Sequence, residues 1–250
     1  MTESPRETRV LDAVVSLVDS LLDDFDVVEL LTELTGRCAG LLDVASAGLL
    51  LADTRRQLHL MAATTEAARE LELFQIQGDE GPCLDCFATG KPVLVADLPA
   101  EEQRWPRFAA AAADAGFMSV HAVPMRAAGT VLGALGLFGT STGELNDADQ
   151  LVAQTLAHVA CVAIMQEHAP TADSVPQRLR AALSSRMVVE QAKGFIRERL
   201  GVTVEEAFGL LRRYARTNEL HLTDISRRLM EQPESRQEIL AAMSLLAAEQ

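Results

Sequence analysis

Two cysteines three residues apart, Cys83 and Cys86, are the first candidates for chemistry in this chain of 250 residues. A Cys-x-x-Cys pair can lower the pKa of a thiol and act as a redox couple. A thioredoxin-like pair should follow a strand, whereas this one follows a Gly-Pro pair, and zinc would need two further ligands although no second close pair of cysteines exists. We therefore expect both thiols to pack as small apolar groups, with redox sensing as the alternative and no metal site.

A second candidate set is basic and lies in the last third of the chain. Only Lys91 and Lys193 of the 22 basic residues are lysines, and Lys193 is followed directly by Gly194. Residues 178–228 hold 11 Lys/Arg and 6 Asp/Glu, a net charge of +5, whereas residues 1–169 hold 10 and 25, a net charge of −15. The overall charge of −14 is therefore unevenly distributed: an acidic segment is followed along the chain by a compact basic one.

Local patterns indicate which elements carry these residues. Apolar residues at steps of three and four predict helices, and short apolar or alternating runs between turn residues predict strands. The predicted helices cover residues 6–22, 25–42, 65–74, 101–115 and 145–166, and four more follow residue 177. The predicted strands cover residues 45–53, 56–64 and 92–97, and two further strands within 117–139. Lys193-Gly194 thus falls inside a helix, where glycine costs about 1 kcal/mol relative to alanine.

The helical tail resembles the ANTAR family, an RNA-binding antiterminator module. The centre of the resemblance is Arg-x-x-x-x-Gln-Ala-Lys-Gly, which here runs from Arg186 to Gly194. It continues through Glu205-Glu206-Ala207-Phe208, Ala215-Arg216, Asn218 and Asp224-Ile225, and Ser226 is a small departure from the usual alanine. The resemblance implies that the tail binds paired RNA hairpins and favours an antiterminator over a terminator.

The chemistry of the matched residues agrees with RNA as the partner. Arginine forks bind phosphate and stack on bases, lysine supplies a compact charge, and glycine lets a partner approach the backbone. The candidate RNA-binding residues are Arg186, Gln191, Lys193, Gly194, Arg197, Arg212, Arg213, Arg216 and Asn218. The alternatives are an ordinary solvated helix face for the arginines and helix packing for Gly194.

The front of the chain resembles a GAF domain, an α+β sensor related to PAS domains, over about residues 25–168. The resemblance rests on the order of elements and on DEGPCLDCFATGKPVLVADL at residues 79–98. GAF domains bind cyclic nucleotides, tetrapyrroles, metals or other small molecules, or nothing. No pocket signature identifies a cofactor here, so the sequence leaves the ligand unknown.

These resemblances predict the domain organisation. We expect an α+β fold in which a PAS-like GAF domain, an antiparallel sheet flanked by helices, precedes a small all-α ANTAR domain. The segment EHAPTADSVPQ at residues 167–177 has two prolines and few apolar residues, so it indicates a linker. The predicted parts are an N-terminal helix at 1–24, the GAF domain at 25–168, the linker at 169–176 and the ANTAR domain at 177–250, with its core at 177–232.

The sequence contains no recognisable catalytic motif. A phosphate-binding P-loop, Gly-x-Ser-x-Gly and His-Glu-x-x-His do not occur, and the five histidines are scattered. We therefore predict no enzyme and no catalytic residue, but an RNA-binding transcription antitermination regulator under the control of a GAF sensor. The alternatives are a DNA-binding or protein-binding signalling regulator whose GAF domain senses a small molecule or redox state.

Location, assembly and regulation complete the expectations. No apolar run approaches the roughly 18 residues typical of a membrane span, and the first residues are polar, so we expect a cytoplasmic protein without a membrane partner. The helices at 6–22 and 146–166 carry apolar residues near heptad spacing, which predicts a homodimer. The opposite charges of the two halves predict that the front domain docks on the tail and restrains it.

Overall fold

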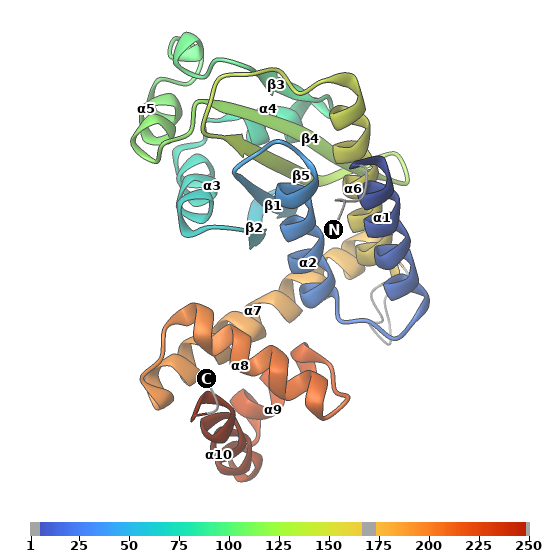
Figure 1. Cartoon of the computed structure of the whole chain (residues 1–250), viewed down its shortest axis with the longest axis vertical. Coiled ribbons are helices and arrows are strands. Elements are labelled where there is room, and N and C mark those ends of the chain that lie inside the picture. Colours follow the sequence, from blue (N-terminus) through green and yellow to red (C-terminus); the bar gives the residue numbers. More distant parts are fainter. Residues whose placement is uncertain (1–5, 167–173, 249–250) are drawn as a thin grey trace.

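The computed structural model describes residues 6–166 and 174–248 of the chain. A mixed unit of helices and strands is followed by a helical unit, and one long helix, α7, reaches from the first into the second (Figure 1). Residues 169–173 of the predicted linker at 169–176 lie outside the described residues. Of the linker's last residues, Ser174 is the N-cap of α7, and residues 175–176 are the first of the helix.

Five strands form one antiparallel sheet in the order β2-β1-β5-β4-β3. The strands are β1 (Ser46–Ala52), β2 (Leu58–Ala63), β3 (Val93–Val95), β4 (Ser119–Ala127) and β5 (Thr130–Gly139). A two-residue turn joins β4 to β5 at Ala128-Gly129, with φ angles of 49° and 75°. Positive φ at both central residues is the type I′ geometry that suits the twist of paired strands, and glycine adopts it without strain.

Helices lie on both sides of the sheet. On one side are α1 (Arg6–Leu22), α2 (Val27–Leu41) and α6 (Asp147–Gln166), with α1 packed on the other two. On the other side are α3 (Glu66–Gly78), α4 (Pro82–Thr89) and α5 (Pro106–Asp114) (Figure 1). Successive side chains of β1 point to opposite faces of the sheet. Leu49 and Leu51 therefore join the core with α2 and α6, whereas Leu50 joins the cluster around α4.

The tail consists of four helices whose ends follow local signals. They are α7 (Val175–Leu200), α8 (Val204–Thr217), α9 (Leu222–Glu231) and α10 (Pro233–Ala248). Gly201 ends α7 in the left-handed conformation, with φ of 67°. Thr203 and Glu206 form the predicted capping box of α8.

The two units share a continuous hydrophobic core. One cluster extends from the sheet beneath α2 and α6, through Leu179, Val189 and Ile196 of α7, to Leu211 and Ile225 of the tail. Apolar burial is the main stabilising term in folding. The tail is therefore docked on the front unit by packing as well as by polar contacts.

The structure confirms the predicted α+β class and corrects two local predictions. The helix predicted at 101–115 is present, but its predicted start is wrong, because a 3₁₀ turn at Pro99–Glu101 precedes α5, which begins at Pro106. Proline has no backbone N–H and therefore favours the first turn of a new helix. Helix α4 was not predicted, since eight residues are too few for a clear helical period.

One described helix, α6, is long and apolar enough by length and composition to span a membrane. Half of its most apolar window is buried inside the fold, where α6 packs on β4 and α2. Core helices of folded proteins share these properties.

Candidate nucleic-acid interface

The predicted RNA-binding residues lie on two neighbouring helices of the tail. Helix α7 carries Arg186, Gln191, Lys193, Gly194 and Arg197, helix α8 carries Arg212, Arg213 and Arg216, and Asn218 follows the end of α8. The structure divides them into two groups. One group faces the front unit, and the other faces solvent or the tail itself.

Arg186 and Lys193 lie where α7 meets the front unit, and both share one counter-charge. Arg186 Nη2 is 2.6 Å from Glu190 Oε1, and Lys193 Nζ is 2.8 Å from the same oxygen. Each basic side chain is only 13% exposed. Burial raises the pKa of Glu190, but Arg186, Lys193 and Arg69 together outweigh it and hold the pKa below its ordinary value. In this docked arrangement, Lys193 therefore forms an ion pair with Glu190 of its own helix.

Arg212 and Arg216 of α8 contact the front unit directly through Glu29 of α2. Arg216 donates to Glu29 Oε1 from Nη2 at 2.8 Å and from Nε at 3.1 Å, and Arg212 Nε donates to the same oxygen at 3.2 Å. Arg216 remains 62% exposed. One carboxylate of the acidic half thus neutralises two of the predicted phosphate-binding arginines.

Two further carboxylates beside Glu29 complete this contact. Asp26 caps α2 with one oxygen, accepting from Val28 N at 2.9 Å, and its other oxygen accepts from Thr223 N of α9 at 2.7 Å. Asp24 Oδ2 is 2.9 Å from His221 Nε2. We call Asp24, Asp26 and Glu29 the acidic segment. Its central residue, Asp26, thus caps the start of one helix of the front unit and the start of one helix of the tail.

The acidic segment was missed at the sequence level. An aspartate before an apolar helical run is a recognisable N-cap signal, so the role of Asp26 in α2 could have been found. Its second partner lies 197 residues away along the chain. No local pattern indicates such a contact.

The opposite side of α7 is open. Gln191, Gly194 and Arg197 are exposed, and a Cβ added at Gly194 would meet no atom within 4 Å. Packing within the described part of the chain therefore does not explain this glycine. The surface around it is free to meet a partner.

Arg213 and Asn218 make contacts within the tail. Arg213 Nη1 donates to Leu246 O of α10 at 3.1 Å, and Asn218 Nδ2 donates to Tyr214 O at 2.8 Å. Both side chains donate to main-chain carbonyl groups near helix ends. These two side chains help to hold the tail together, whatever else they bind.

The two candidate redox cysteines lie inside the front unit on α4. Both are free thiols and fully buried. Burial raises the pKa of Cys86 to about 12, and burial and the nearby Glu72 raise the pKa of Cys83 well above its ordinary value. A thiolate is the reactive form of cysteine, so these surroundings favour structural packing over redox sensing.

Beside Cys83 lies a buried carboxyl group, Glu72 of α3, which sequence reasoning did not single out. Gln75 Nε2 donates to Glu72 Oε2, and Cys83 Sγ lies 3.7 Å from Oε1. Burial raises the pKa of Glu72 to about 8, although both of these hydrogen bonds act to lower it. Glycines at 48 and 136 leave room for this side chain, because a Cβ at either would stand 2.6 Å from Oε1.

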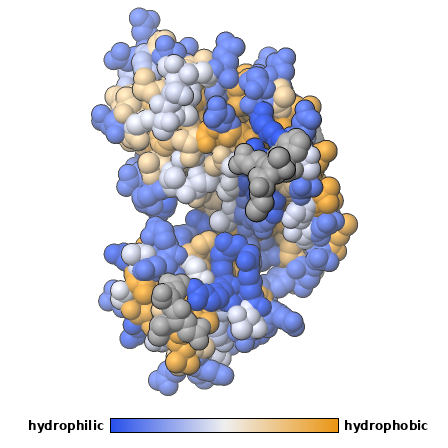
Figure 2. Space-filling view, in the orientation of Figure 1, coloured by the Kyte–Doolittle hydropathy of each residue, from blue (hydrophilic) through white to orange (hydrophobic). Residues whose placement is uncertain are grey.

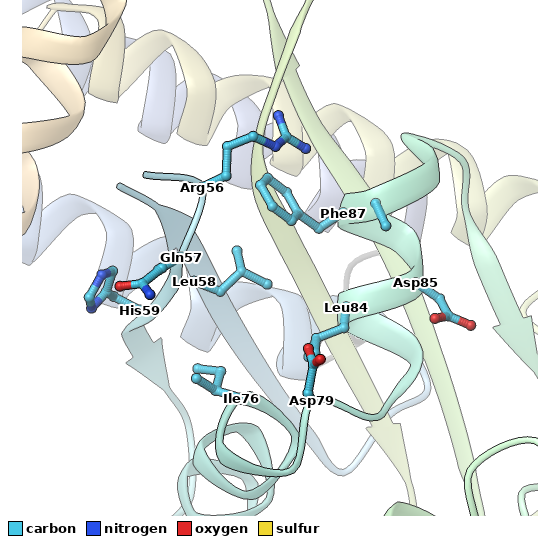
Figure 3. Close-up of a pocket in the computed structure, with 10 residues that line it drawn as sticks. Arg56, Gln57, Leu58, His59, Ile76, Asp79, Leu84, Asp85 and Phe87 are labelled. Carbon is cyan, nitrogen blue, oxygen red and sulfur yellow. The ribbon is translucent and has the colours of Figure 1, made fainter. Parts of the chain in front are cut away.

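A cavity of about 630 Å³ opens between the start of β2 and helices α3 and α4 (Figure 3). Leu58, Ile76 and Leu84 are among the apolar residues of its lining, and the guanidinium carbon of Arg56 lies 4.6 Å from the centre of the Phe87 ring. Small-molecule sites commonly measure about 300–1,000 Å³ and combine apolar walls with a few polar groups. The cavity therefore has the size and lining of a ligand site in the front unit.

Comparison with known proteins agrees with this architecture. A family model of the GAF domain matches residues 26–165, and a model of the ANTAR domain matches residues 177–230. The basic residues of α7 and α8 thus fall within the ANTAR match, whereas the acidic segment and the 630 Å³ cavity lie at or within the GAF match. No curated protein was found to match the chain.

Solved structures show the same fold for the front unit. The GAF domain of a phosphoenolpyruvate-protein phosphotransferase from Coxiella burnetii is 17% identical, with a TM-score of 0.51 over 65% of this chain and 95% of its own. A second structure, described as a GAF domain, is 14% identical, with a TM-score of 0.50 over 64% of this chain and 89% of its own. Since the GAF match spans more than half of the 250 residues and the ANTAR match follows it, this chain belongs to the GAF domain family and has the GAF–ANTAR architecture.

Proposed function

We propose that this GAF–ANTAR protein binds RNA hairpins through α7 and α8 and regulates transcription antitermination under the control of its GAF domain. ANTAR is an RNA-binding antitermination domain and GAF is a sensor domain; neither is a catalytic domain. The observation that carries the proposal is the location of the basic residues: the cations suited to phosphate lie on α7 and α8, the first two helices of the ANTAR match. We further propose a cytoplasmic location, where nascent transcripts occur.

Control would follow from the contact between the domains. RNA phosphate and the Glu29 carboxylate compete for Arg212 and Arg216, because each guanidinium satisfies only a limited set of acceptors. The docked arrangement keeps Arg186 and Lys193 turned toward the GAF domain as well. A signal that favours an undocked state would release these four cations, provided that it binds that state more tightly.

The proposal is tested by titrating the full chain with a labelled paired RNA hairpin and with duplex DNA of the same length, at two salt concentrations. We expect preference for the hairpin and a steep loss of affinity with salt. Lys193→Ala with Arg216→Ala should lower the slope of log K against log salt by roughly 1.5, since each phosphate contact contributes about 0.7–0.9.

Arg55→Ala with Arg104→Ala is the matched control. It removes two positive charges from the GAF domain and should leave the slope unchanged. Equal slopes in all three proteins would exclude the proposed face, and preference for duplex DNA would favour a DNA-binding regulator.

We also propose that the chain acts as a homodimer. Helix α1 exposes apolar side chains at intervals of four, three and four residues, namely Leu11, Val15, Val18 and Leu22. Neighbouring α6 also exposes two apolar side chains, Leu151 and Val162, and Figure 2 shows apolar residues along the edge where α1 lies. This spacing matches the seam of a coiled coil.

Light scattering tests the dimer. The wild type should have twice the mass of one chain at micromolar concentration, and Val15→Lys should reduce it to one. Leu245→Lys changes an exposed apolar residue of α10 and serves as the control. A wild-type monomer would contradict the proposal.

A further inference from the structure

A second cavity, of about 450 Å³, lies where the ANTAR helices meet the GAF domain. Its GAF wall comes from β2 and the start of α3, and its ANTAR wall comes from α7 and the start of α8. Three cationic side chains line it: Arg69 of α3, with Arg186 and Lys193 of α7. The cavity is therefore assembled only when the two domains are docked.

Three carboxylates also line this cavity, and Glu190, which is 33% exposed, is the least exposed of them. Glu190 faces Arg186 at 2.6 Å and Lys193 at 2.8 Å with a single oxygen. Arg186 Nε is buried and has no hydrogen-bond partner among the described residues. Burial lowers the pKa of Arg186, Glu190 opposes this, and the charge of Arg69 adds to it. An acceptor oxygen beside Arg186 would satisfy a donor that is costly to leave unpaired.

Arg69 adds a third cation that is only weakly neutralised. Its partner Glu66 stands 2.9 Å away on the same helix, but their side chains are 43% and 57% exposed. Ion pairs at such exposed sites contribute little because water and salt screen them. Glu205, the remaining acidic residue of the lining, is also exposed. The lining thus holds three cations and three carboxylates, and its two least exposed charged side chains are the cations Arg186 and Lys193, each 13% exposed.

The N-terminal end of α3 also favours an anion in this cavity. Thr64 and Thr65 line the cavity, and Thr65 caps this helix of 13 residues by accepting from Ala68 N at 3.2 Å. The N-terminal end of a helix carries partial positive charge and free N–H groups, which favour anions. A helix end, two guanidinium groups and an ammonium group therefore border one space.

We propose that this interdomain cavity binds the phosphate group of a small phosphorylated metabolite. The phosphate oxygens would face the three cations of the lining, Arg186, Lys193 and Arg69. The volume leaves room for a sugar or a nucleoside attached to the phosphate, since it lies within the usual range of small-molecule sites. The bound molecule bridges the two domains and holds them docked.

This inference deepens the proposed function, on which its regulatory consequence rests. Arg186 and Lys193 are also predicted RNA contacts, so the metabolite and RNA phosphate exclude each other. A ligand that binds only the docked state stabilises that state by RT ln(1 + [L]/Kd). A phosphorylated metabolite would therefore act as an antagonist of RNA binding.

Calorimetric titration of the full chain tests the site directly. The probes are inorganic phosphate, ribose 5-phosphate and AMP, with ribose and adenosine as uncharged controls. We expect a phosphorylated probe to bind and both uncharged compounds not to bind. Arg69→Ala should weaken binding at least tenfold, whereas Arg104→Ala, which removes a similarly exposed arginine that does not line the cavity, should not. Failure of all three phosphates, or equal binding by Arg69→Ala, would overturn the proposal.

Competition with RNA supplies the second measurement. A saturating phosphorylated probe should lower the hairpin affinity of the wild type at least fivefold and should have little effect on Arg69→Ala. Equal losses in both proteins would indicate general ionic competition and would overturn the inference. If no hairpin binds in any condition, the proposed function fails while the calorimetry still decides whether the cavity binds phosphate.

Discussion

The protein uses acidic residues in two different ways, at the domain contact and inside the GAF domain. Glu29 of the acidic segment faces two arginines at a partly exposed contact, and its charge is matched by theirs. Glu72 is fully buried among neutral donors, and its pKa of about 8 keeps the carboxyl largely protonated near neutral pH. Another anion can therefore replace a carboxylate at a charged contact with solvent nearby, whereas a buried neutral carboxyl belongs to the core.

The largest expected effect concerns Glu72. Its folded-state pKa of about 8 exceeds the ordinary value of 4.5, so the folded protein holds the proton more tightly between these pH values. The free energy of unfolding should therefore fall as pH rises through this window, by up to about 1.4 kcal/mol per pH unit, and level off above it. Glu72→Gln, which carries no charge, should remove this fall and be most stabilising at pH 8 and above.

Urea unfolding at pH 6, 7 and 8.5 measures the effect. Glu70→Gln changes an exposed residue of the same helix and should keep the wild-type pH dependence. If Glu72→Gln and wild type lose stability in parallel, the carboxyl is not a buried neutral group.

The next effect in size concerns Asp26, which caps α2 and α9 together. Asp26→Ala removes both caps, and each cap is worth about 1 kcal/mol, so the free energy of unfolding should fall by roughly 2 kcal/mol. Hydrogen exchange should show increased opening at the starts of both helices. Thr203→Ala removes the cap of α8 alone and should cost about half as much. Exchange that increases only in α2 would show that the carboxylate does not cap α9 in solution.

A smaller effect is expected from Glu29→Gln, which removes the charge but keeps the shape. Partly exposed ion pairs contribute up to about 1 kcal/mol. The variant should therefore bind an RNA hairpin up to about fivefold more tightly, because Arg212 and Arg216 no longer face a competing carboxylate. Glu33→Gln is the matched control, since Glu33 pairs with Arg37 of its own helix at 2.6 Å. Weaker RNA binding by Glu29→Gln would reverse the proposed restraint and make the contact an activating one.

The smallest effect concerns Gly194, on the side of α7 that neither acidic site touches. Gly194→Ala meets open space and should stabilise the helix by about 0.5–1 kcal/mol. A loss of hairpin affinity despite this gain would show that RNA approaches the backbone there. Unchanged hairpin affinity of Gly194→Ala would mean that RNA contacts only the cations that face the GAF domain, namely Arg186, Lys193, Arg212 and Arg216. Gly209→Ala, in an equally open position of α8, controls for helix propensity.

Much of the fold could be predicted because its signals are local. Helical periods fixed α1, α6 and the tail helices, and the capping box of Thr203 and Glu206 fixed the start of α8. The motif from Arg186 to Gly194 identified the ANTAR helix. Local signals failed where an element was short, as for α4, and where proline divided an alanine-rich stretch before α5.

The candidate site could be predicted only as a set of residues, not as an arrangement. The sequence alone determined that the tail is basic, that the front is acidic and that the cations repeat along two helices. The tertiary structure decided that Arg212 and Arg216 meet Glu29, that Asp26 caps a second helix, and that glycines at 48 and 136 admit a buried glutamate. Periodicity and capping act within one or two turns of a helix, whereas charge pairing and burial depend on which distant segments the packed core brings together.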